Sequence, residues 1–114
     1  MKYIIAGGRD FNHFDLLRET CEKIIVNDLE IEIVSGTAKG ADLLGEDYAK
    51  LKGYPIKRFP PDWSIGRKAG PLRNIEMGKY GDVLIAFWNG ESRGTNHMIT
   101  VAKERGLEVH VINY

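Results

Sequence analysis

Short apolar runs alternate along the chain with longer stretches in which apolar residues recur at helical spacing. The runs, each expected to form a buried strand, cover residues 3–6, 31–34, 55–59, 83–88 and 109–112. Between the first two runs, one face of a predicted helix is formed by Phe14, Leu17, Cys21, Ile24 and Ile25. The pattern predicts strands and helices in regular alternation.

Three further helices are predicted between the remaining runs. The second has an apolar face formed by Ala41, Leu44, Tyr48 and Leu51, and it is expected to stop at Gly53. The third is expected to start near residues 70–71, because proline is tolerated in the first turn of a helix, and to end at the glycines within 78–81. It is therefore expected to be shorter than the other helices. The fourth has an apolar face formed by Met98, Val101 and Ala102.

This alternation predicts the fold class. Parallel strands need right-handed crossover connections, which cover both faces of a sheet with helices. We therefore expect a Rossmann-like α/β sandwich of three layers, with five parallel strands in the order 3-2-1-4-5 and with residues 1–114 forming one domain. The loops after strands one and four would flank the point where the winding reverses, and ligands bind there in such folds.

Charge and cysteine content narrow the function classes. Lys plus Arg equals Asp plus Glu at 16 each, which weakens the case for nonspecific binding of single-stranded nucleic acid. Cys21 is the only cysteine, and His13, His97 and His110 lack metal-ligand spacing, so we expect no disulfide and no metal site. The first apolar run is too short for a signal peptide or a membrane span, and we expect a soluble, cytoplasmic protein with no membrane partner.

Four connections combine glycine with hydroxyl, amide or charged side chains: residues 7–11, 35–42, 66–74 and 88–96. Glycine lets backbone N–H groups approach an anion closely, and a following helix N-terminus adds about half a positive charge. These loops predict a phosphate-bearing ligand. The candidate ligand-binding residues are Gly7, Gly8, Arg9, Asp10, Ser35, Gly36, Thr37, Lys39, Gly40, Asp42, Trp63, Arg73, Asn74, Asn89, Gly90, Glu91, Ser92, Arg93, Gly94 and Thr95. Alternatively, the glycines only make tight turns and pack helices on the sheet, while Ser92, Thr95 or Asn96 caps a helix.

No standard cofactor or catalytic motif is present. The first loop lacks the spaced glycines of dinucleotide folds, and the second lacks the Gly-Lys-Ser/Thr ending of a phosphate loop, so no cofactor is expected. Ser35 has no pattern of His and Asp partners that would indicate a hydrolase triad. Asp10, Asp42 and Glu91 could each bind a ribose hydroxyl or act as a base, or simply solvate and cap their loops.

Two tryptophans could stack on a nucleobase. Trp88 ends an apolar strand and belongs more naturally to the core, so Trp63 is the preferred stacking candidate. Trp63 lies in residues 60–70, a connection that contains two prolines and is the only segment expected to act as a lid.

The four loops resemble those of the SLOG superfamily, which groups the DNA-processing DprA proteins with the LOG nucleotide phosphoribohydrolases, and they look closest to its small YspA-like branch. Residues 35–42 are similar to the DprA pattern Ser-Gly-x-Ala-Arg-Gly-x-Asp, with Lys39 in place of the arginine. Arg73 and Asn74 match the Arg-Asn pair of that family. The resemblance implies that both segments face the ligand.

LOG enzymes carry the pattern Pro-Gly-Gly-x-Gly-Thr-x-x-Glu, of which this chain keeps Gly94 and Thr95 but has Met98 at the position of the catalytic glutamate. Arg73 could supply the arginine of that reaction. A methionine cannot stabilise a ribosyl cation or activate water, so catalysis would depend on another carboxylate, with Glu91, Asp10 and Asp42 as candidates.

Three hypotheses follow. The leading one is a nucleotide-binding protein whose ligand, a nucleotide or nucleotide-derived small molecule, places its phosphate over residues 90–95 with Arg73 and Arg9 neutralising it. The second is an N-glycosidic nucleotide hydrolase, and the third is a DprA-like module for single-stranded DNA. Self-association into a homo-oligomer is left open.

Overall fold

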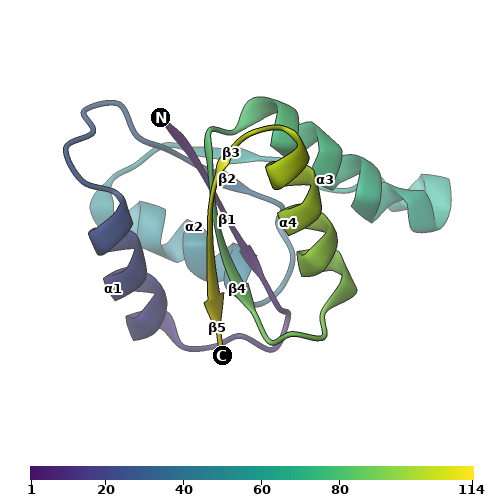
Figure 1. Cartoon of the computed structure of the whole chain (residues 1–114), viewed down its shortest axis with the longest axis horizontal. Helices are drawn as coiled ribbons and strands as arrows, with labels where there is room; N and C mark the ends of the chain where they lie inside the picture. The colour runs from purple at the N-terminus through teal and green to yellow at the C-terminus, as the bar shows by residue number, and fades with distance from the viewer.

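The computed structural model describes all residues from 1 to 114 and has the predicted alternation of elements. In chain order these are β1 (Lys2–Gly7), α1 (Phe14–Ile24), β2 (Glu32–Ser35), α2 (Ala41–Lys52), β3 (Ile56–Arg58), the 3₁₀ helix η1 (Trp63–Lys68), α3 (Ala69–Tyr80), β4 (Val83–Trp88), α4 (Arg93–Glu104) and β5 (Glu108–Asn113) (Figure 1). The α/β class is confirmed.

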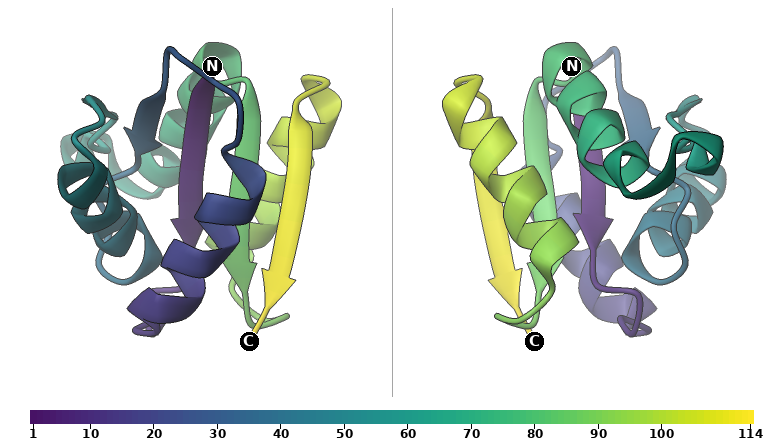
Figure 2. Two further views of the ribbon diagram at one scale, coloured as in Figure 1. Left: turned by 90° about the vertical axis from the view of Figure 1, so that its left-hand side faces the viewer. Right: turned by 90° about the vertical axis from the view of Figure 1, so that its right-hand side faces the viewer.

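The five strands form one parallel sheet in the order β3-β2-β1-β4-β5, which confirms the expected topology. In the centre of the sheet, Ile4 of β1 lies opposite Val34 of β2 and Leu84 of β4. Helices α1 and α2 cover one face of the sheet, and α3 and α4 cover the other (Figures 1 and 2). The chain therefore leaves the adjacent strands β1 and β4 toward opposite faces, which opens a crevice at their carboxyl ends.

Each face of the sheet has its own core, because successive strand residues point to opposite sides. Tyr3 and Ile5 of β1 belong to a cluster of 13 buried residues beneath α1 and α2. Ile4 and Ala6 belong to a cluster of 10 beneath α3 and α4. Cys21 lies in the first cluster, as the helical spacing predicts, and burial raises the pKa of its thiol to about 12.

Two features of the connection into α3 differ from the expectations. Helix α3 begins at Ala69 and has 12 residues, as many as α2 and α4, so the prediction of a shorter helix is wrong. The segment expected to act as a lid is largely folded into η1, with the Asp62 side chain accepting a hydrogen bond from the Ser64 N–H. Together η1 and the start of α3 form an arm that projects from the body of the molecule (Figure 1). No residue of η1 is buried.

None of the helices combines the length and the apolar character needed to span a bilayer.

Candidate functional site

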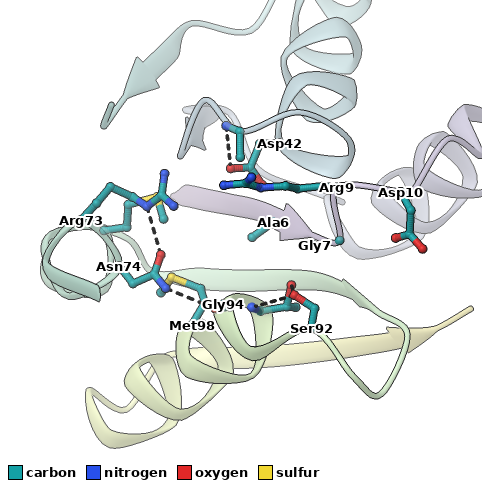
Figure 3. A pocket seen from close by; sticks show the side chains of 14 residues that line it. Ala6, Gly7, Arg9, Asp10, Asp42, Arg73, Asn74, Ser92, Gly94 and Met98 are labelled. Atoms are coloured by element: carbon teal, nitrogen blue, oxygen red, sulfur yellow. Dashed lines mark hydrogen bonds between the residues drawn. The ribbon is translucent and has the colours of Figure 1, made fainter. Parts of the chain in front are cut away.

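A cleft of about 470 Å³ opens at the carboxyl edge of the sheet, between the loops that follow β1 and β4 (Figure 3). This is the position that the topology predicts for a ligand. Its lining residues are Ala6, Gly7, Gly8, Arg9, Asp10, Ala38, Asp42, Arg73, Asn74, Met77, Ser92, Gly94, Thr95 and Met98. Residues from all four of the glycine-containing connections, or from the helices that they start, therefore meet in one place.

Part of the glycine content serves packing. A Cβ atom on Gly7 would lie 2.8 Å from the Cβ of Ala41, so glycine is needed where β1 passes α2. Gly40 has a φ of +88°, and a Cβ atom there would lie 2.7 Å from the Cα of Arg9. The loops after β1 and β2 are thus packed against each other, and the interpretation of these glycines as close-packing residues holds at both positions.

The N-terminus of α4 forms one wall of the cleft. The Ser92 hydroxyl caps the helix by accepting a hydrogen bond from the Thr95 N–H at 3.3 Å. Upstream, the Asn89 side-chain oxygen accepts from the N–H groups of Glu91 and Ser92 at 2.9 Å each. The next two N–H groups, at the first two helical positions, have no acceptor within the helix. They add their partial positive charge to this end of α4.

Arg73 is held in a fixed position at the opposite wall. Its Nε–H donates to the Asn74 side-chain oxygen at 3.1 Å, and one terminal N–H donates to the carbonyl of Gly36. A guanidinium has five N–H donors, so these two contacts leave donors for an anion. Burial lowers the pKa of Arg73 and the nearby Asp42 opposes this shift.

Asn74 lines the cleft and also connects two of its walls. Its side-chain nitrogen lies 3.2 Å from the carbonyl oxygen of Gly94, to which it donates, and 3.1 Å from Nδ1 of His97. Both residues of the Arg-Asn pair therefore line the cleft, and Asn74 in addition ties α3 to the start of α4 (Figure 3).

Asp42 is the most buried charged group of the cleft, with 5% of its surface exposed. Burial raises the pKa of its carboxyl to about 6, although the hydrogen bond from the Ala38 N–H and the charge of Arg73 oppose the shift. A cleft carboxyl with a pKa near neutrality, beside a guanidinium, can exchange a proton with a ligand or accept a hydrogen bond from a hydroxyl.

The start of the DprA-like segment lies behind the cleft and does not line it. Ser35 is 1% exposed, and its hydroxyl donates to Glu46 at 2.7 Å while accepting from the Thr37 N–H at 3.0 Å. Glu46 in turn pairs with Arg58 at 2.9 Å. Thr37 has a φ of +66°, which this network maintains. With the start of the segment held in this way, its later residues Ala38 and Asp42 line the cleft.

Several other predicted site residues do not line the cleft. Trp63 lies on the projecting arm with 57% of its surface exposed. Trp88, which is predicted to be a core residue and not a site residue, is half-buried against the second core cluster and donates its ring N–H to the carbonyl of Ser92 at 3.1 Å. The remaining predicted residues outside the cleft lining are Gly36, Thr37, Lys39, Gly40, Asn89, Gly90, Glu91 and Arg93. Of these, Lys39 and Gly40 line an adjoining cavity.

The three candidate carboxylates differ in position. Asp42 points into the cleft, whereas Glu91 is exposed outside it. Asp10 lies at the rim, where the Tyr114 hydroxyl donates to its Oδ1 at 2.5 Å, and its side chain points away from the centre (Figure 3). Tyr114 was not among the predicted residues, and a single position at the end of a strand carries no local signal for such a contact.

Two apolar positions outside the four glycine-containing connections, which lacked a functional prediction, also line the cleft. Ala6 is the last residue but one of β1, and Met77 follows Arg73 by four residues and so shares its helical face. Met98 lines the cleft and is 1% exposed, so it is both a core residue and a wall residue. The chain holds no group of three His, Cys, Asp or Glu side chains arranged to bind a metal ion.

The fold and the cleft together define a doubly wound parallel α/β protein with a ligand cleft at its topological switch point. Within this class, the chain belongs to the family described as the YspA, cpYpsA-related SLOG family, whose model matches residues 1–66. It is also similar to the Gene 61 protein of Mycobacterium phage D29, with 39% identity over 84 residues, which cover 68% of this chain and 67% of that protein. The resemblance inferred from the loops is confirmed at the level of the family.

Proposed function

We propose that this protein binds a phosphate-bearing nucleotide or nucleotide-derived ligand in the cleft between β1 and β4. The observation that carries the proposal is the convergence of Arg73, Arg9 and the N-terminus of α4 around the buried carboxyl of Asp42. Membership of a SLOG family is consistent with nucleotide-related binding. The volume of about 470 Å³ falls in the range of about 300–1,000 Å³ that is usual for small-ligand sites.

The proposed pose follows from the charges. The ligand phosphate lies at the start of α4, where two N–H groups lack helical acceptors and the Thr95 hydroxyl lines the cleft. The free donors of Arg73 complete the anion site, because a guanidinium matches phosphate geometry. Asp42 cannot stabilise a phosphate, and it accepts hydrogen bonds from sugar hydroxyls instead.

Calorimetric titration and thermal unfolding test this proposal. The ligands are AMP, CMP, GMP, UMP and inorganic phosphate. A ligand at one hundred times its dissociation constant should add about 2.7 kcal/mol to the free energy of unfolding. Arg73→Met should weaken binding about tenfold or more, since hydrogen bonds to charged groups contribute about 1.5–3 kcal/mol.

The matched control is Lys79→Met, which removes a positive charge from an exposed position at the other end of α3. It should leave binding unchanged. The proposal is wrong if no member of the panel binds, or if Arg73→Met folds normally and binds like the unmodified protein.

One observation favours a second candidate function, hydrolysis of the N-glycosidic bond of a nucleotide. Asp42 is a buried carboxyl inside the cleft, and it could stabilise a ribosyl cation or activate water in place of the glutamate that Met98 replaces. We nevertheless favour binding without hydrolysis, because the carboxylate is absent from the position that LOG enzymes use.

Chromatography of AMP, CMP, GMP and UMP after incubation with the protein separates the two candidates. We expect no free base above the buffer control. Base release that disappears in Asp42→Asn and persists in Glu91→Gln would establish the hydrolase and assign the carboxylate. Glu91 is the matched control because it is exposed outside the cleft lining.

A further inference from the structure

A second cavity adjoins the cleft at the same edge of the sheet. It has a volume of about 420 Å³ and lies between the β1–α1 loop and the start of α2. Its lining residues are Arg9, Asp10, Phe11, Asn12, Lys39, Gly40, Leu43 and Leu44. Arg9 and Asp10 line both cavities, so the two spaces meet at these residues. Each volume suits one small-molecule group.

The second cavity combines an apolar side with a basic rim. Leu43 is 44% exposed although it lines a concavity, and Phe11 is buried at its base. Lys39 and Arg9 supply the positive charge, while the carboxylate of Asp10 is already hydrogen-bonded by Tyr114. An apolar surface beside two cations suits an organic ring group attached to an anionic linker.

The boundary between the cavities is formed by fixed backbone. The carbonyl of Gly8 accepts hydrogen bonds from the N–H groups of Phe11 and Ala41, both at 3.2 Å. These bonds join the β1–α1 loop to the first residue of α2. These bonds fix the wall between the two cavities, so this part of the protein needs little ordering when a ligand spans both.

We propose that the ligand has two organic groups joined through a pyrophosphate. One nucleoside lies in the main cleft, the pyrophosphate extends from the anion site at the start of α4 past Arg9, and the second ring group lies against Leu43 in the adjoining cavity. The inference rests on the function proposed above and adds the class of ligand. A mononucleotide would fill only one cavity and leave the apolar surface of the other in water.

Calorimetry with AMP, ADP and diadenosine pyrophosphate tests the inference. Diadenosine pyrophosphate should bind at least about tenfold more tightly than ADP, because it covers both cavities. Leu43→Gln should remove this gain while leaving the affinity for ADP unchanged, since Leu43 does not line the main cleft. The matched control is Leu51→Gln on the same helix, where the leucine is 61% exposed and lines neither cavity. It should keep the gain.

The outcomes separate the two proposals. If AMP and ADP bind but diadenosine pyrophosphate binds no more tightly, the two-sided ligand is wrong and the proposed function stands. If the gain survives Leu43→Gln, the second group lies elsewhere and the inference is equally wrong. If none of the three binds, the proposed function fails and the inference fails with it.

Discussion

At the scale of single residues, the ionisation of Asp42 links the cleft to the stability of the protein. Its pKa is raised from 3.8 to about 6, so the folded state holds this proton more tightly than the unfolded state does. Stability from the protonated carboxyl is therefore fully present below about pH 4 and is lost as the pH rises through about 6. Near pH 7 the buried charge costs about 3 kcal/mol at most, because each unit of pKa shift corresponds to about 1.4 kcal/mol.

Asp42→Asn should consequently stabilise the protein near pH 7 by about 1–3 kcal/mol and have little effect at pH 4. The amide oxygen can still accept the hydrogen bond from Ala38, which isolates the effect of charge. Urea unfolding at both pH values measures the difference. Asp47→Asn, an exposed position on the same helix, is the control and should change neither value. Equal destabilisation by Asp42→Asn at both pH values would contradict the argument.

At the scale of elements, the start of α4 has two roles that can be separated. The Ser92 hydroxyl caps the helix, and it also lines the cleft where we place the phosphate. Ser92→Ala should cost about 1 kcal/mol of stability, because the Thr95 N–H loses its acceptor. Ser92→Asp keeps a capping oxygen and suits the helix dipole, so stability should stay close to that of the unmodified protein.

For ligand binding we expect the reverse order, with Ser92→Asp more damaging than Ser92→Ala. Ser92→Asp places a negative charge at the proposed anion site and should weaken AMP binding about tenfold or more, whereas Ser92→Ala should weaken it less. Thermal unfolding and calorimetry on the same preparations measure both properties. If Ser92→Asp binds AMP as tightly as the unmodified protein does, the phosphate does not lie at this helix terminus.

At the scale of the whole molecule, charge balance argues against nonspecific binding of single-stranded nucleic acid. The net charge is zero, with 16 acidic and 16 basic side chains, so no extended positive surface follows from composition. We expect no measurable binding of a short oligothymidylate at about 150 mM salt, because such binding depends on the release of counterions by many cationic contacts. Fluorescence anisotropy is the measurement. Salt-sensitive binding at this ionic strength would favour the DNA-binding hypothesis.

Much of the architecture and the location of the site could be predicted from the sequence. The period of the apolar positions determined which segments are strands and which are helices, and the strict alternation implied the parallel order of the sheet. That order places the loops after β1 and β4 side by side, so the glycine-rich connections were expected to meet. Arg73 and Asp42 were among the predicted residues that line the cleft.

Only the tertiary structure decided which residues of each loop face the cleft. Ser35 turns inward because Glu46 and Arg58 form a network with it, and Trp63 lies on an arm whose direction depends on α3. Tyr114 reaches Asp10 across 104 positions of sequence. Local periodicity reports the conformation and the buried face of an element, because these depend on neighbouring residues. The direction of a loop side chain and the burial that raises the pKa of Asp42 depend on contacts between elements that are distant in the chain.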